Sequence, residues 1–179
     1  GFAVAVQEQT AAFNKATGMM GHYNKAIGEA FRATTAAGGS FELAAESFGT
    51  LITTTARFTD MAPAQTQAIA ETTVVLERLG IDMATTAQNV NIMTTSLNMN
   101  ASEAEETSRR LFTAAQQMGV APQQMAADFA AAGAQFASFG ENAVDAFIDL
   151  REAAKKTGIE LQELLSITEQ FTTFEGAAN

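Results

Sequence analysis

Few side chains in this 179-residue sequence could carry out acid–base chemistry, and none stands in a recognisable catalytic pattern. His22, the only histidine, is the candidate base of a hydrolytic triad. The sequence contains no Gly-x-Ser-x-Gly segment to present a serine nucleophile, and no motif places a carboxylate beside the histidine. We therefore interpret His22 as a surface or helix-end residue next to Tyr23.

Three glutamates, Glu103, Glu105 and Glu106, form the densest group of carboxylates. Two such groups could act as the acid and the base of a glycosidase. Their place just after a helix-start signal favours another role, because acidic side chains in a first turn complement the helix dipole. Arg109 and Arg110 lie four residues after Glu105 and Glu106, which predicts i,i+4 ion pairs on a solvated face.

Metal, cofactor and phosphate sites are not indicated either. The chain contains no cysteine, and a single histidine leaves only carboxylates as metal ligands. No EF-hand loop, Walker segment, dinucleotide-binding glycine motif or His-Glu-x-x-His segment occurs. Gly38-Gly39-Ser40 predicts a helix break, because no strand precedes it and no lysine follows it. We expect no catalytic residue, no cofactor and no metal.

The net charge of −10 argues against sequence-specific binding to nucleic acids, because phosphate contacts require clustered lysine and arginine. The basic residues are dispersed along the chain, and the same charge disfavours anionic membrane surfaces. No run of about 18 apolar residues occurs, so stable transmembrane insertion of this segment is not expected.

The composition predicts an all-α fold. Alanine and glutamine favour helices, and only two prolines are present to interrupt them. The β-branched residues are mostly threonine and are scattered, so the alternation typical of strands is scarce. We expect consecutive short amphipathic helices packed as antiparallel αα-hairpins, without a sheet.

Five residues that tolerate a left-handed backbone divide the later part of the chain at intervals of 18 or 21 residues. They are Gly80, Asn98, Gly119, Gly140 and Gly158. Glycine and asparagine are the residues that most readily close a helix at the position after its C-cap. Ile or Val follows three of the glycines, which suits the apolar contact of a Schellman ending.

Helix-start signals accompany these stops. Asn100 and Ser102 each precede a glutamate by three residues, which gives two overlapping capping-box patterns. Pro63 and Pro122 suit a first helical turn, where proline loses no hydrogen bond. Ser40 can cap a helix that carries an acidic residue in its first turn.

Apolar residues recur every three or four positions between the breaks and predict one buried face per helix. One such face runs from Met125 to Phe139. Its phenylalanines could line a ligand groove, but their helical spacing favours packing between helices. The predicted helix-packing residues are Leu97, Leu111, Met118, Phe129, Phe136, Phe139, Phe147, Leu150, Leu164, Phe171 and Phe174. Because these faces are narrow and rich in alanine, one hairpin alone is marginal, and further helices or other copies must complete it.

Two regions are expected within a longer chain. Residues 1–60 are rich in Ala, Gly and Thr and predict weaker helices near 3–16, 22–36 and 40–58. Residues 61–179 form the helical-hairpin region, and a soft boundary falls near Asp60–Pro63.

Several segments in residues 65–179 share the same pattern of helix breaks and apolar helix faces. They are Met-Gly-Val-Ala-Pro-Gln-Gln-Met-Ala at 118–126, Phe-Ala-Ser-Phe-Gly at 136–140, Thr-Gly-Ile at 157–159 and Phe-Thr-Thr-Phe-Glu-Gly-Ala-Ala at 171–178. Together they resemble phage tail tape measure proteins, most closely the long virion proteins of contractile-tailed phages.

The resemblance implies a structural protein of the virion and not an enzyme. Such proteins are long and mostly helical, and several copies lie inside the tail tube. Their length determines tail length, they contact tail tube and baseplate hub proteins, and they are ejected before the DNA. For this segment the resemblance implies self-association, as a trimer or a hexamer, and a location in the tail tube or baseplate.

Two other classes of non-enzymatic protein remain open. The first is a helical baseplate-hub plug or another virion assembly or binding module, such as an α-solenoid. The break spacing gives helix pairs of about 39 residues, within the range of HEAT-like units, although side-chain identity does not repeat. The second is a chemoreceptor-like coiled coil, which would need sustained heptads that the glycine breaks interrupt.

Overall fold

The computed structural model describes residues 22–178, with side chains through residue 170. The helix expected near residues 3–16 lies outside this part. Helices, turns and loops account for all of the described residues, and none forms a strand, so the all-α prediction is confirmed. The helices are α2 (Asn24–Thr34), α3 (Phe41–Thr54), α4 (Pro63–Arg78), α5 (Met83–Thr95), α6 (Ala101–Met118), α7 (Pro122–Ala132), α8 (Ala143–Thr157) and α9 (Leu161–Ala178), with 3₁₀ segments η1 (Thr35–Ala37), η2 (Phe58–Asp60) and η3 (Gly133–Asn142).

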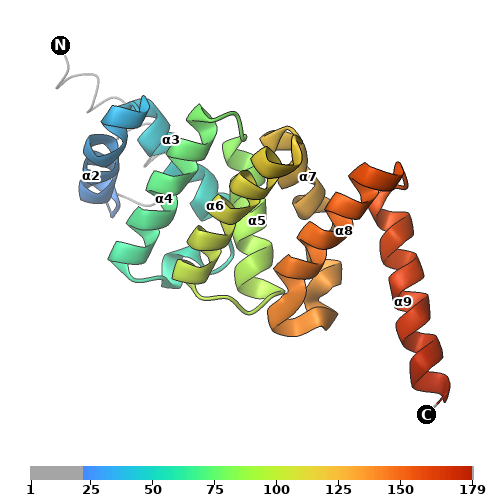
Figure 1. Ribbon diagram of the computed structural model, residues 1–179. Helices are drawn as coiled ribbons and strands as arrows, with labels where there is room; N and C mark the ends of the chain where they lie inside the picture. Colours follow the sequence, from blue (N-terminus) through green and yellow to red (C-terminus); the bar gives the residue numbers. More distant parts are fainter. Residues whose placement is uncertain (1–21, 179) are drawn as a thin grey trace.

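The helices stack in two rows (Figure 1). Helices α2, α4, α6 and α8 pack side by side in one row, and α3, α5 and α7 do so in the other. Neighbours in the chain also pack against each other from α2 to α7, which makes each consecutive pair a hairpin. Almost every contact therefore joins helices that are one or two positions apart in the chain, and the body grows along one direction.

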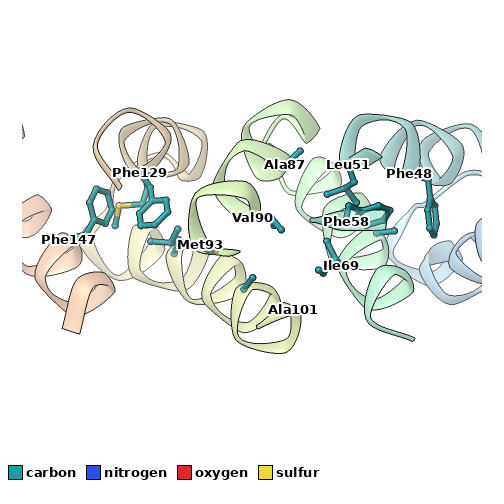
Figure 2. Packing of buried hydrophobic residues seen from close by; sticks show 14 of the residues in the cluster. Phe48, Leu51, Phe58, Ile69, Ala87, Val90, Met93, Ala101, Phe129 and Phe147 are labelled. Carbon is teal, nitrogen blue, oxygen red and sulfur yellow. The ribbon is translucent and has the colours of Figure 1, made fainter. Parts of the chain in front are cut away.

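One continuous core runs along this stack. Figure 2 shows its buried side chains, from Phe48 and Phe58 at one end to Phe129 and Phe147 at the other. These four phenylalanines are fully buried, and the Phe129 and Phe147 rings meet edge to face with centroids 5.1 Å apart. The boundary expected near Asp60–Pro63 coincides with the link between η2 and α4, and the core extends across it.

The backbone φ is positive at all five predicted breaks, Gly80, Asn98, Gly119, Gly140 and Gly158. The predicted helix-closing role is wrong at Gly140, because α7 already ends at Ala132 and Gly140 lies inside η3 with ψ −128°. Gly119 shows most clearly why such a residue ends a helix. Its φ is 70°, and this turn lets the next amide, of Val120, donate to Ala115 O at 2.9 Å. This bond spans six residues and defines a Schellman ending, which the chain also forms at Gly80 through Ile81. The ending at Gly158 is simpler: its own amide bonds Ala154 O, and Ile159 stays exposed.

The helix starts also follow the predicted signals. Ser40 accepts a hydrogen bond from the Leu43 amide at 3.1 Å, and Pro63 and Pro122 each occupy a first turn. Of the two overlapping boxes before α6, the structure uses Asn100, whose Oδ1 accepts from the Glu103 amide at 2.8 Å. Ser102 lies inside the helix and is exposed.

Because Asn100 and not Ser102 caps α6, substitutions at the two positions should differ in their effect on stability. Asn100→Ala is expected to lower the free energy of unfolding by about 1 kcal/mol, because a helix-end amide loses its acceptor. Ser102→Ala, two residues away, is the matched control and should be neutral or slightly stabilising, since alanine is the better helix former. Urea unfolding followed by circular dichroism measures both variants. Equal losses would contradict the assignment of Asn100 as the cap.

The single helical face expected from Met125 to Phe139 is wrong beyond Ala132. The α-helix ends there and η3 follows, with a non-helical kink at Gly140 (φ 59°, ψ −128°). In a 3₁₀ helix, side chains three residues apart lie one above the other. Accordingly, the Phe136 and Phe139 rings stack with centroids 5.6 Å apart, and Phe136 stays fully buried.

Candidate interaction surface

The candidate catalytic residues occupy the positions expected of structural ones. His22 is exposed at the start of α2, and its ring meets Tyr23 edge to face with centroids 4.7 Å apart. Tyr23 is only 6% exposed, and burial raises its pKa, so the phenol stays protonated at neutral pH. Among the described residues, neither side chain has the hydrogen-bonded partner that a base or nucleophile requires.

Of the three glutamates after Asn100, Glu105 contacts another helix, and one of the two predicted ion pairs forms. Glu105 and Arg109 pair at 2.7 Å, but Thr72 of α4 also donates to Glu105 at 2.7 Å, so the group joins α4 to α6 instead of facing only solvent. Arg110 does not pair with Glu106; it pairs with Asp145 of α8. The packing of α8 against α6 brings that carboxylate within reach, which spacing along one helix could not indicate.

Polar side chains also join α5 to α7, which are neighbours in the same row. Asn89 of α5 donates through Nδ2 to Ala126 O of α7 at 3.1 Å. Gln123 of α7 accepts from the Asp82 amide at 2.8 Å and donates to Thr85 at 3.1 Å. Neither Asn89 nor Gln123 is among the residues predicted from the sequence to pack helices together. In the sequence, each is marked only as a polar residue close to apolar positions. Its hydrogen-bond partner on another helix is identifiable only from the fold.

A groove of about 460 Å³ lies where α7, α8 and the start of α9 meet. Small side chains line it, including Ala131 and Ala154, together with Leu161. Asp128 and Arg151 also line it and form an ion pair at 2.7 Å, with side chains 25% and 16% exposed. Asp128 and Arg151 compensate each other and Glu160 adds a negative charge, so the groove is not an anion site; its small side chains suit another helix.

Helix α9 adjoins this groove and extends away from the body (Figure 1). Its principal packing partner is α8, and Leu165, 1% exposed, belongs to the core. Ile167 is 48% exposed and Leu164 is half-buried. From Glu160 to the end of the sequence there are four glutamates and no lysine or arginine. The helix therefore presents apolar and acidic side chains together.

The predicted helix-packing residues lie mostly in the core. Leu111, Phe129, Phe136 and Phe147 are buried, and the partly buried Leu97, Met118, Phe139 and Leu150 pack against the same core. Leu164 is half-buried, and its neighbour Leu165 is the deeply buried residue of α9. The side chains of Phe171 and Phe174 lie outside the described part.

No protein-family model, curated protein or solved structure matches this chain. Within residues 22–178, no group of three or more histidine or acidic side chains is arranged to hold a metal ion. In the same part of the chain, no helix is both long enough and apolar enough to cross a membrane. The groove and α9 together form a candidate interaction surface.

Proposed function

We propose that this chain is a non-enzymatic structural segment of a phage tail protein of the tape measure type, folded locally into a stack of helical hairpins. The proposal rests on one observation: the polar side chains bind helices to each other and do not form a catalytic site. Glu105, Gln123 and Asn89 bind neighbouring helices of the stack to each other. What stays open is a surface suited to helix packing, beside a projecting helix.

The architecture supports a role in the tail, inside the tube or at the baseplate hub. In a stack with contacts between near neighbours only, each hairpin adds its own share of stability, and the stack can be taken apart from one end. The chain has no cysteine, so no disulfide would cross-link it. A protein that leaves through a narrow tube before the DNA must come apart stepwise and must carry no cross-links. Its negative charge also disfavours adhesion to the DNA that follows.

Tail length tests this proposal. Removing residues 83–118, the α5–α6 hairpin, from the parent tail protein would shorten the tail by about 54 Å if these residues formed one continuous helix, at ~1.5 Å per residue. We expect a much smaller change, because the two helices are antiparallel neighbours in a folded stack. Electron microscopy of assembled tails measures the difference. Shortening by the full helical length would contradict local folding, and tails of unchanged length would contradict a ruler role for this segment.

We further propose that the chain associates with a second copy through α9 and the groove. Both lie at the same end of the stack, so a twofold arrangement would place α9 of each copy in the groove of the other. The small side chains of the groove accept a helix, and Leu164 and Ile167 of α9 supply the apolar face. The same contact repeated around a different axis would give the trimer or hexamer that the resemblance implies.

Ile167→Glu is expected to weaken this association by about 10–100-fold, because burying an isoleucine contributes ~1.5–3 kcal/mol. Ser166→Glu is the matched control, since it adds the same charge at the adjacent exposed position. Sedimentation velocity of the 179-residue chain measures both.

Salt gives an independent check on the same contact. Because α9 carries three glutamates and no lysine or arginine, association should strengthen between about 0.05 M and about 0.5 M NaCl as repulsion is screened. A chain that stays monomeric at both concentrations would contradict the proposal of self-association.

A second candidate is a solenoid-type binding module of the baseplate hub, and the two-row stacking favours it. Such a module would remain monomeric and hold a segment of another tail protein in the groove. Binding of the monomer to purified hub or tube protein, lost in Ile167→Glu and kept in Ser166→Glu, would favour this candidate over self-association.

A further inference from the structure

A small cavity lies where α4, α5, α6 and α7 meet, apart from the surface groove. Its volume is about 10 Å³, and apolar side chains from the four helices form most of its lining. Three polar side chains line it as well: Thr86 and Asn89 from α5, and Ser108 from α6. All three are buried, with exposures of 3%, 3% and 6%.

Two polar atoms at this cavity have no protein partner within the described part of the chain. They are Thr86 Oγ1 and Asn89 Oδ1. Other buried threonines form a hydrogen bond within their own helix: Thr73 and Thr94 each donate to the carbonyl four residues earlier, at 2.8 and 2.9 Å. A buried polar atom without a partner is costly and rare in folded proteins. Two such atoms at one cavity indicate a shared third partner.

The orientations at the site are determined by bonds that already exist. Asn89 Nδ2 donates to Ala126 O, so a flipped amide would bring two oxygens together, and Oδ1 must remain an acceptor facing elsewhere. Ser108 Oγ donates to Ala104 O at 2.9 Å, which uses its hydrogen and leaves its lone pairs free to accept. The Thr86 hydroxyl retains its hydrogen. The site therefore offers one donor and two acceptors.

A single water molecule meets each of these requirements. It accepts one hydrogen bond from Thr86 and donates one each to Asn89 Oδ1 and Ser108 Oγ, which makes three bonds, the usual number for buried water. The cavity volume of about 10 Å³ lies at the lower limit of ~10–15 Å³ for one water molecule and leaves no room for a larger ligand. A cation does not fit, because the site has no carboxylate and one of its three groups is a donor.

We propose that one ordered water molecule occupies this cavity and bridges α5 to α6 through Thr86, Asn89 and Ser108. Since Asn89 also binds the backbone of α7, the water completes a polar junction of three consecutive helices. Shifting any one of the three along its axis would leave these atoms unpaired, so the junction selects one register of the stack.

Water–protein cross-relaxation in the labelled 179-residue chain tests this directly. Water is expected to show nuclear Overhauser effects to the Asn89 side-chain amide and the Leu111 methyl groups, with opposite signs in the laboratory and rotating frames. That sign pattern identifies a long-lived internal water. Oxygen-17 relaxation dispersion counts such waters without interference from exchanging hydroxyl protons.

Thr86→Val/Asn89→Leu removes the donor and one acceptor and fills the cavity, so the dispersion amplitude should fall by the contribution of one water molecule. Thr94→Val is the matched control, because Thr94 is equally buried on α5 but bonded within its helix, and its amplitude should equal that of the unsubstituted chain. If the double variant loses its helical circular dichroism, the cross-peaks of the unsubstituted chain decide. Absent cross-peaks, or an unchanged amplitude in a folded double variant, would overturn the proposal.

Discussion

Phe147→Ala is expected to lower the free energy of unfolding by about 3–5 kcal/mol, a large part of the total stability of a domain of this size. The side chain is fully buried, and its ring meets those of Phe129 and Phe136 edge to face, with centroids 5.1 and 5.6 Å apart. It is the point at which α7, η3 and α8 share one cluster. Alanine would leave a cavity that the stacked Phe136 and Phe139 rings cannot fill without leaving their own contacts.

Two control substitutions test whether burial causes this loss. Phe139→Ala makes the same chemical change at a partly buried position of the same cluster, so it should cost clearly less. Leu79→Ala changes a side chain that is 50% exposed and should stay within about 0.5 kcal/mol of the unsubstituted chain. Urea unfolding gives all three values. Equal losses at Phe147 and Phe139 would show that this cluster is not packed as described.

The second large effect is expected at Gly39, in the turn between η1 and α3. A Cβ atom there would lie 2.2 Å from Thr34 Oγ1, 2.7 Å from Thr34 Cβ and 2.9 Å from Thr34 O. Thr34 cannot move aside easily, because it is 2% exposed and its hydroxyl donates to Ala30 O at 2.8 Å. Gly39→Ala should therefore cost about 1–3 kcal/mol, the usual range for forced overpacking.

Gly28 provides the contrast, because it is a glycine in the middle of α2 with space around it. Its added Cβ would meet only Arg32 Nη1, at an ordinary 3.7 Å. Gly28→Ala should therefore raise the free energy of unfolding by about 0.5–1 kcal/mol through helix propensity. Adding Thr34→Ala to Gly39→Ala should restore only part of the loss, since the Thr34 backbone carbonyl remains. A neutral Gly39→Ala, measured by thermal and urea unfolding, would contradict the close approach at this turn.

Features that depend on residues close in the sequence were predictable, and features that depend on distant residues were not. Helix ends depend on one residue's tolerance of positive φ and on hydrogen bonds that span at most six residues, so Gly80, Asn98 and Gly119 were identifiable in isolation. The overlapping caps before α6 were left open, because both patterns satisfy the same local rule. The structure uses Asn100, since the chain turns there to begin the next hairpin.

Long-range partners were not predictable in the same way. Arg110 has an acid four residues before it, but it pairs with Asp145, 35 positions along the chain. The segment after Ala132 carries an apolar spacing that suits an α-helix, but it tightens to a 3₁₀ helix so that Phe136 and Phe139 stack beside Phe147. Local propensity differs little between these alternatives, and burial of the aromatic rings determines which one forms.

The amino-acid sequence by itself determined the all-α class, most of the helix ends and part of the buried core, because these depend on backbone preference and on apolar periodicity along one helix. Only the tertiary structure decided the order of stacking, the polar bonds between helices of the same row, the small cavity at Thr86 and Asn89, and the groove beside α9. These features arise from side chains that are distant in the chain. Their positions depend on how the helices pack against each other, and no local pattern encodes that directly.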